Sequence, residues 1–298
     1  MIHKNIEVIG EGELDIGQRV SIQPGVQVIF HRPAKVTIAD YCNIGPGVKI
    51  ICDGGDVNLG EWTTLHDRCL LLSTVGLQVG AHGWFGQHTV LDGTGGLTIG
   101  NGVRVGMYSQ IWSHVAAGEQ IEGCTLFGQR PVVLENDVWL VGSCIVASGV
   151  TMGHRAVALI ASNITKSWPA HSVVAGSPAV RKESLSFYKT IQPDEQWQLL
   201  AGWLGEIAET FQLQAMASPV GLAFCWADKR NADTIVFVKD ATQATVAIQN
   251  FAGATVCCLA NKSYLKRLTE LEHRVLKYLS GNKARFIAVV DGGFNTSK

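Results

Sequence analysis

The chain has 298 residues, with 24 lysines and arginines against 25 aspartates and glutamates, and its formal net charge is -1. This balance lacks the basic surplus that grips a phosphate backbone, so we expect no nucleic-acid partner. No run reaches the roughly 18 apolar residues that a membrane span needs, and Met1 to Gly10 lack the apolar core of a secretory signal, so we expect no membrane span and a cytoplasmic protein.

Eight cysteines occur without C-x-x-C spacing, and most of them lie within apolar runs. This pattern favours reduced, buried thiols, with a cysteine nucleophile or a metal site as the alternative. The cysteines are Cys42, Cys52, Cys69, Cys124, Cys144, Cys225, Cys257 and Cys258.

A six-residue period runs through the first part of the chain. Apolar residues begin successive hexads, and small or β-branched residues often stand four places later, while glycine often follows the first residue. The hexads begin at Ile16, Ile22, Val28; Ile38, Ile44, Ile50; Leu59, Leu65, Leu71; Val79, Phe85, Leu91; Ile99, Val105, Ile111; and Leu134, Leu140, Val146, Met152, Ala158, Ile164.

A period of six fits neither the 3.6-residue turn of a helix nor simple strand alternation, and it requires a short strand followed by a corner. Three hexads make a triangular coil whose apolar residues point inward and stack on the coil below. The alternative, an all-β sandwich with glycine-rich turns, would not keep a six-residue phase over such lengths. The sequence therefore predicts a parallel β-helix.

The spacing between coils predicts one long excursion. The coil starts from Ile16 to Ile99 are 20 to 22 residues apart, close to three hexads with small corner insertions. From Ile99 to Leu134 the spacing is 35 residues, which leaves about 17 residues, Val115 to Pro131, looped out. A loop of that length inside a regular solenoid is usually functional.

After Arg181 the hexads stop, and residues 182–192 read as a linker. Pro193 and the acids after it predict a helix start, and apolar residues then recur at helical spacing to Phe211. The remaining sequence predicts a small α/β domain. The sequence does not indicate its function, and partner docking, acceptor selection and support of the oligomer are the alternatives. The expected strands are Gly221 to Trp226, Thr234 to Val238, Thr245 to Gln249, Thr255 to Leu259 and Arg285 to Val290, with a helix from Ser263 to Leu279.

Two stretches resemble the hexapeptide-repeat acyltransferases, particularly the branch of maltose, galactoside and surface-polysaccharide acetyltransferases. The first is LENDVWLVGSCIVASGVTMG from Leu134, followed by ITKSWPAHSVVAGSPAVR ending at Arg181. The second is TVLD, Thr89 to Asp92, with IWSH, Ile111 to His114, after it. The resemblance covers about Ile16 to Arg181. It implies a left-handed parallel β-helix, a homotrimer with sites between subunits, and acetyl-coenzyme A as co-substrate.

The resemblance places the catalytic histidine of that family at His114, just before the long loop. Acetyl transfer to an alcohol needs a base, and the histidine pKa of about 6.5 suits that role at neutral pH. The likeness implies that the coenzyme is held at Ser143, Ala161, Lys166, Pro178 and Arg181. A solvated surface role is the alternative for His114 and for Lys166.

For the acceptor, Asp92 matches an aspartate that binds sugar hydroxyls in the family. It equally fits a local hydrogen bond within its turn, Leu91 to Gly96. Gln87, His88 and Trp84 lie on the preceding hexad and are the other candidates for the acceptor pocket, with packing or solvation as the alternative.

Two other function classes stay open at this stage. The γ-class carbonic anhydrases use the same β-helix with three zinc-binding histidines, and His66, His82, His88 and His114 fall in one part of the solenoid here. Their hexad phases disagree, so one chain could not gather them, and we predict no metal. A β-helix without catalysis, used as a scaffold, is the other class.

The sequence therefore predicts a mainly β protein, with a left-handed parallel β-helix domain over residues 1–181, a linker over 182–192, and a helix plus small α/β domain over 193–298. The expected reaction is acetyl transfer from acetyl-coenzyme A to a hydroxyl of a sugar or surface-polysaccharide precursor. N-acylation of an amino sugar is the alternative within the same class.

Overall fold

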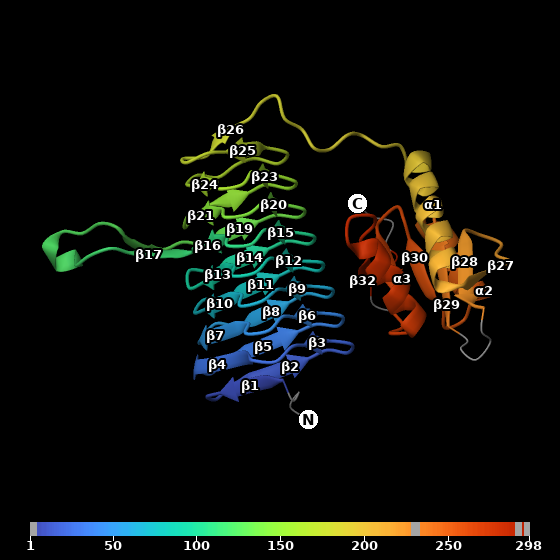
Figure 1. Ribbon diagram of the computed structural model, residues 1–298, viewed down its shortest axis with the longest axis horizontal. Coiled ribbons are helices and arrows are strands. Elements are labelled where there is room, and N and C mark those ends of the chain that lie inside the picture. Colours follow the sequence, from blue (N-terminus) through green and yellow to red (C-terminus); the bar gives the residue numbers. More distant parts are fainter. Residues whose placement is uncertain (1–4, 228–232, 290–293, 295–298) are drawn as a thin grey trace. The chain divides into compact units, whose positions relative to one another are not determined.

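The computed structural model describes residues 5–227, 233–289 and 294. The chain divides into two compact units, the first ending at Phe187 and the second beginning at Tyr188 (Figure 1). The division falls inside the segment 182–192.

The first unit is a parallel β-helix with three sheets, here named A, B and C. Sheet A contains β1 (Ile6–Ile9), β4 (Val26–Arg32), β7 (Lys49–Asp53), β10 (Leu70–Ser73), β13 (Val90–Gly93), β16 (Gln110–Ile111), β21 (Ile145–Val146) and β24 (Asn163–Ile164). Sheet B contains β2 (Glu13–Ile16), β5 (Lys35–Ile38), β8 (Val57–Leu59), β11 (Leu77–Val79), β14 (Leu97–Ile99), β19 (Val132–Leu134) and β22 (Thr151–Met152). Sheet C contains β3 (Ser21–Ile22), β6 (Asn43–Ile44), β9 (Thr64–Leu65), β12 (Trp84–Phe85), β15 (Arg104–Val105), β20 (Trp139–Leu140), β23 (Val157–Ala158), β25 (Val173–Ala175) and β26 (Val180–Arg181).

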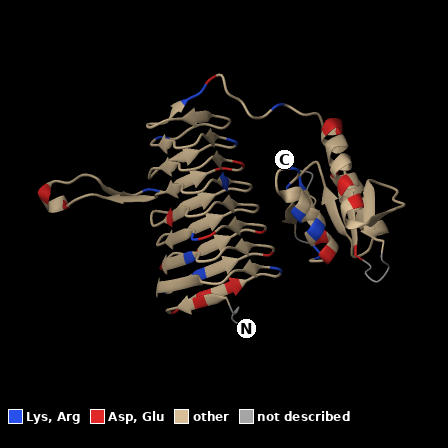
Figure 2. Ribbon diagram, in the orientation of Figure 1, with Lys and Arg blue, Asp and Glu red and all other residues tan. Residues whose placement is uncertain are grey.

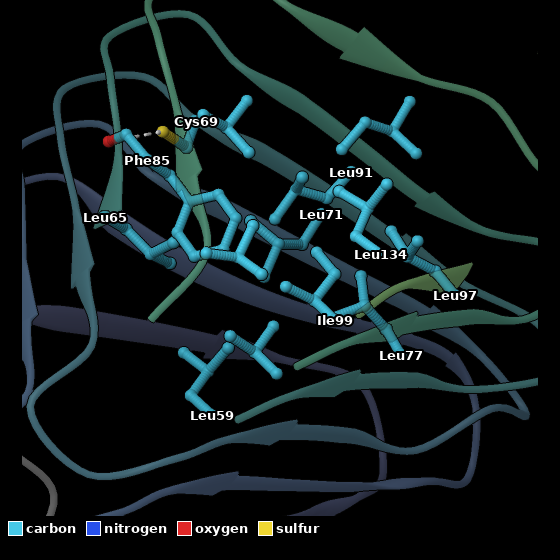
Figure 3. Packing of buried hydrophobic residues seen from close by; sticks show 14 of the residues in the cluster. Leu59, Leu65, Cys69, Leu71, Leu77, Phe85, Leu91, Leu97, Ile99 and Leu134 are labelled. Carbon is cyan, nitrogen blue, oxygen red and sulfur yellow. Dashed lines mark hydrogen bonds between the residues drawn. The ribbon is translucent and has the colours of Figure 1, made fainter. Parts of the chain in front are cut away.

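The register of the sheets stacks each hexad position on the same position of the next coil. In sheet A, Leu71 pairs with Leu91, Leu91 with Ile111, and Ile111 with Val146. These side chains are fully buried in one continuous core, part of which Figure 3 shows. Because a coil can bury its apolar residues only against its neighbours, this stacking is the main source of stability of the unit. The predicted hexad register and the predicted β-helix are confirmed.

The predicted excursion is a β-hairpin that leaves the coils, seen in Figure 1 as the arm that carries the label β17. Strand β17 (His114–Ala116) pairs in antiparallel fashion with β18 (Phe127–Gln129), and a 3-10 turn, η1 (Gln120–Glu122), lies near the tip. The chain returns to sheet B without disturbing it, since Ile99 still pairs with Leu134 across the insertion.

The second unit is a small α/β structure. Its six-stranded sheet has the order β27 (Leu213–Met216), β28 (Leu222–Trp226), β29 (Thr234–Val238), β30 (Thr255–Cys258), β31 (Ser263–Leu265) and β32 (Ile287–Val289). Its helices are α1 (Pro193–Phe211), α2 (Ala241–Asn250) and α3 (Glu270–Ser280). Helix α1 begins at the predicted Pro193, and its buried face includes Leu200, Leu204 and Ile207.

Two expectations for this unit are wrong. The predicted strand Thr245 to Gln249 lies inside α2, because Asp240 caps the helix by accepting a hydrogen bond from the Gln243 amide, and the helix buries small alanines. The predicted helix from Ser263 begins instead at Glu270, and Ser263–Leu265 is a strand paired with β30. Strand β27 was not predicted, and Val290, the expected end of the last strand, lies outside the described residues.

Three broad expectations can be compared with the structure. Figure 2 shows Lys and Arg as well as Asp and Glu residues in both units, in agreement with the balanced charge of the sequence. All eight cysteines are free, and six of them are buried, while Cys124 and Cys225 are half-buried. Within the described part of the chain, no helix is long and apolar enough to cross a membrane.

Candidate active site

Two corners of the β-helix carry the candidate residues. At the CA edge the chain passes from a sheet C strand to the next sheet A strand, and at the AB edge it passes from sheet A to sheet B. Each coil places one residue with left-handed backbone at the CA edge, and neighbouring coils stack these residues. They are Gly25, Gly47, Arg68, His88, Tyr108, Ser143 and Ala161, with φ values between 49° and 81°.

His114 lies at the AB edge, where the hairpin leaves sheet A, and it is held by Asp92 of the preceding coil. The His114 Nδ1 atom lies 2.7 Å from Asp92 Oδ2. The Asp92 side chain is 0% exposed, whereas that of His114 is 36% exposed. The pair thus joins a buried carboxylate to an imidazole that solvent or a substrate can reach.

The Asp92 carboxylate also accepts hydrogen bonds from two neighbouring residues, Ser113 and Thr94. Ser113 donates to Oδ2 from its amide at 2.7 Å and from its hydroxyl at 3.0 Å. Thr94 donates to Oδ1 from its amide at 3.1 Å and from its hydroxyl at 2.5 Å. Burial raises the pKa of the Asp92 carboxyl, but the hydrogen bonds from Thr94, His114 and Ser113 outweigh it and hold the pKa below its usual value.

This arrangement fixes the tautomer of His114. An ionised carboxylate only accepts hydrogen bonds, so the proton of the neutral imidazole lies on Nδ1, and Nε2 keeps its lone pair. The Trp112 ring stands edge-on to the imidazole, with centroids 6.0 Å apart. The group can therefore accept a proton at Nε2 while Asp92 stabilises the cation that forms.

The sequence placed Asp92 among acceptor-binding residues, whereas in the structure its fully buried carboxylate is bonded to Thr94, Ser113 and His114. Gln87 and His88 lie at the CA edge, at the opposite end of β13, about 13 Å along the strand from Asp92. Trp84 lies on sheet C, half-buried, with its ring against that of His66. One chain therefore does not gather these residues around His114.

The predicted coenzyme residues also divide between the two edges. Ser143 and Ala161 are exposed on adjacent coils of the CA edge, where the Ala161 amide donates to Gly142 at 2.9 Å. Lys166 is exposed at the AB edge, with its Nζ atom 4.7 Å from the centre of the Trp168 ring. Pro178 follows a cis peptide bond and is exposed, and Arg181 pairs with Glu183 at 3.2 Å.

The histidines that suggested a metal site lie against separate aromatic rings. His66 packs on Trp84, His82 stacks on Trp62, and His88 stacks on Tyr108. Over residues 5–227, 233–289 and 294, no group of three or more His, Cys, Asp or Glu side chains is arranged to hold a metal ion.

Two supporting residues were missed from the sequence, Ser113 and Thr94. Their signal was available in the coil register, because Leu91 pairs with Ile111 and so brings the residues after each of them side by side. Thr94 also stands two residues after Asp92, a spacing typical of a turn closed by an aspartate side chain.

Comparison with known proteins finds sequence relatives among acetyltransferases. The chain is 26% identical over 165 residues to WcaF of Escherichia coli, named for colanic acid biosynthesis and acetyltransferase activity, and the match covers 55% of this chain and 66% of WcaF, just under two thirds. It is 34% identical over 105 residues to Nodulation protein L of Rhizobium meliloti, covering 35% of this chain and 57% of that protein.

Among solved structures, the polysialic-acid-specific acetyltransferase NeuO matches with a TM-score of 0.40 and 15% identity, covering 70% of this chain and 94% of NeuO. No family model matches the chain.

Proposed function

We propose that this protein transfers acetyl from acetyl-coenzyme A to a hydroxyl of a sugar or sugar-containing precursor. The observation that carries the proposal is the pair formed by half-exposed His114 and buried Asp92, with Nε2 of the imidazole left to accept a proton. The sequence likeness to WcaF supports an acetyltransferase acting in surface-polysaccharide synthesis. The proposed compartment is the cytoplasm, where the acetyl donor is made.

In the proposed reaction the acceptor hydroxyl attacks the thioester carbonyl as His114 Nε2 removes its proton. The bond from oxygen to the acetyl carbon forms, the bond from that carbon to sulfur breaks, and the proton passes from the imidazolium to the departing thiolate. Both substrates bind together, so no covalent enzyme intermediate is needed. Asp92 keeps the imidazole in the productive tautomer and stabilises its cation, as an orienting carboxylate does in hydrolases.

The coenzyme is assigned to Ser143, Ala161, Lys166, Pro178 and Arg181, on the resemblance of their motifs. The domain assignment that goes with this proposal places the transferase in residues 1–181, a linker at 182–192 and a separate domain at 193–298. Acceptor contacts are assigned to Gln87, His88 and Trp84, and the role of Asp92 is reassigned from acceptor binding to positioning of His114.

A homotrimer completes the proposed site. The assigned residues lie at opposite edges of sheet A, so a single chain cannot place Ser143 beside His114. A second copy that sets the Ser143 and Ala161 coils of its CA edge against the AB edge of the first would bring the two sets together, and a ring closed by three such contacts pairs every one of these coils with an AB edge.

The substitution His114→Ala tests the proposal. A base that removes the attacking proton typically contributes a factor of about 10² to 10⁴, so turnover should fall by about that much while coenzyme A still binds. The measurement is thiol release from acetyl-coenzyme A by wild type and variant, from pH 6 to 9, on glucose and glucosamine and on their nucleotide-activated forms.

The pH dependence separates the two classes of acceptor. A hydroxyl stays protonated throughout this range, so high pH should not rescue the variant. The neutral form of an amine is already nucleophilic and grows more abundant as pH rises, so recovery toward pH 9 would identify an amino sugar as acceptor. Wild-type turnover by the variant on every accepted substrate would remove His114 from the mechanism.

A further inference from the structure

A second feature of the CA edge lies outside the catalytic pair. A hollow of about 480 Å³ runs along this edge over five successive coils, before the coils that carry Ser143 and Ala161. At its first two coils the hollow is lined by the Pro24–Gly25 and Pro46–Gly47 pairs, which carry no polar side chain. Bulkier side chains line the next three coils, among them Arg68, Gln87 and Tyr108.

Three backbone amides along this hollow are already paired within the β-helix. The amide of Tyr108 donates to the Gln87 carbonyl at 2.9 Å, that of His88 to Asp67 at 3.0 Å, and that of Arg68 to Pro46 at 2.9 Å. A peptide that adds as a strand needs unpaired main-chain groups at a sheet edge. These three amides are therefore not available to a ligand, and we assign recognition in this hollow to its side chains.

The side chains present are planar polar groups with unused hydrogen-bonding capacity. Asp67, Arg68 and Gln87 are exposed or half-buried, and none of them forms a side-chain hydrogen bond or ion pair with any residue in the described parts of the chain. Asp67 and Arg68 are neighbours in sequence and yet do not pair with each other. Carboxylate, guanidinium and amide groups of this kind bind paired hydroxyls through two parallel hydrogen bonds.

An aromatic platform lies at the end of the hollow nearest Ser143. The Tyr108 ring is stacked on the His88 ring, with centroids 5.3 Å apart and planes 9° from parallel, and Tyr108 is 55% exposed. The stacking holds the tyrosine ring in place, so its free face is a fixed apolar surface beside polar groups. The carbon-bound hydrogens of a pyranose ring, flanked by hydroxyls, are complementary to such a surface.

The length of the hollow favours a chain of sugars over a single one. Neighbouring coils are spaced as strands in a sheet, so five coils extend over about 19 Å. One coil spacing is close to the length of one pyranose unit in an extended glycan, so about four units would fit along the four spacings between these coils. The Ser143 amide donates to Met107 at 2.9 Å, which makes the hollow continuous with the proposed coenzyme edge.

We propose that the hollow at the CA edge binds a glycan chain of about four sugar units, and that the acceptor of the reaction is an oligosaccharide or polysaccharide. This inference rests on the proposed function for the identity of the acetylated group, but the glycan site itself is independent of catalysis. Arg68, Asp67 and Gln87 bind hydroxyl pairs of successive units, and Tyr108 stacks on the unit nearest the reacting end.

The test is binding of the full chain to an array of bacterial capsular and lipopolysaccharide oligosaccharides of one to eight units. Wild type should bind at least one series, with affinity that rises to about four units and then levels off. The variant Arg68→Ala/Tyr108→Ala should lose at least tenfold in affinity for the long members. Tyr188→Ala, which removes an exposed tyrosine elsewhere, is the matched control and should bind them as wild type does.

Three results would overturn the inference. They are the absence of binding to any glycan, affinity that does not depend on chain length, and equal affinities of wild type and the double variant. A double variant that changes the oligomeric mass by light scattering while glycan binding persists would assign the hollow to an interface between copies. Failure of the transferase proposal would show separately, as wild-type turnover by His114→Ala.

Discussion

The Asp92 carboxylate is held in place by its surroundings. It is buried beneath His114 and accepts from four protein donors besides the imidazole. Replacement by asparagine keeps its shape but turns one acceptor atom into a donor that faces other donors. We expect Asp92→Asn to lower turnover by about 10²-fold through misplacement of His114, with coenzyme A affinity unchanged in calorimetry.

The same variant has a second expected signature in acid. Because the folded-state pKa of Asp92 lies below its unfolded-state value, the carboxylate stabilises the fold above the unfolded pKa of about 3.9, and this contribution is lost as pH falls through the folded pKa. The difference in unfolding free energy between wild type and Asp92→Asn should therefore shrink as pH drops below about 4. Urea titrations from pH 7 to 2.5 measure it.

Asp53→Asn is the matched control, since Asp53 also accepts a side-chain hydrogen bond, from Arg32, but lies exposed on the surface. It should leave turnover at the wild-type level. Turnover of Asp92→Asn equal to that of the control would show that the carboxylate does not position the base.

Lys166 provides the test of the coenzyme assignment. Its ammonium lies over the Trp168 ring and is exposed, so it is available to the phosphates of the coenzyme. We expect Lys166→Ala to weaken coenzyme A binding several-fold while the apparent affinity for the acceptor stays nearly unchanged. Lys49→Ala, which removes an exposed lysine at the start of β7, is the control, and equal coenzyme affinities in the two variants would return Lys166 to a solvated surface role.

At the scale of elements, replacing a glycine by alanine is expected to have opposite effects on stability in the two units. A Cβ on Gly106 would stand 1.9 Å from the Val141 carbonyl oxygen of the next coil, whereas a Cβ on Gly205 in α1 would meet nothing within 4 Å. We expect Gly106→Ala to destabilise the β-helix by at least about 1–3 kcal/mol, and Gly205→Ala to stabilise the second unit by about 0.5–1 kcal/mol.

Calorimetry gives the two transitions, and hydrogen exchange of the α1 amides assigns the second of them. A Gly106→Ala protein as stable as wild type would mean that the coils can move apart at this corner without cost. An unchanged or lowered stability of α1 in Gly205→Ala would mean that this face of the helix is not open.

The accuracy of the structure predicted from the sequence also differs between the two units. Hexads such as Leu134 to Ile164 predicted the coils and the excursion correctly, because the burial of each residue follows from its place in a strict period. The second unit has no such period. There Thr245 and Val246 suggested a strand, and only the cap at Asp240 and the small buried Ala244 and Ala247 show why a helix forms.

The candidate site was predicted only in part. His114 and Asp92 were both singled out, but their contact was not, because they are 22 residues apart and meet only through the pairing of Leu91 with Ile111. The separation of Ser143 from His114 could not be predicted from the sequence either, because it depends on the corner of the triangular coil at which each residue lies. The roles of these residues stay proposals.

For the whole molecule, the trimer is the expectation that decides how the site works. We expect light scattering after size exclusion, at low micromolar concentration, to give three times the mass of the chain. His114→Ala changes one edge, and Ala161→Trp would block the coenzyme at the other. Refolding the two inactive variants together in equal amounts should restore about a quarter of wild-type activity, because that fraction of shared sites receives two intact edges.

Activity that stays absent in the mixture, or a stable monomer that transfers acetyl, would contradict a site shared between chains. Wild type mixed with each single variant gives the control for refolding yield. A mixture of wild type with Ala161→Trp should retain activity in proportion to the sites that keep both edges.

The hairpin from β17 to β18 leaves the coils and returns without altering the pairing on either side, as Ile99 with Leu134 and Ile111 with Val146 demonstrate. Closing such a loop costs little more as it lengthens, since the cost grows only with the logarithm of its length. The corners of the β-helix can thus carry inserted segments of different length and chemistry, while the coils keep their stacking. A scaffold of this kind can change its substrate when one corner segment is exchanged for another. The His114–Asp92 pair, at the base of the hairpin, would be unchanged by such an exchange.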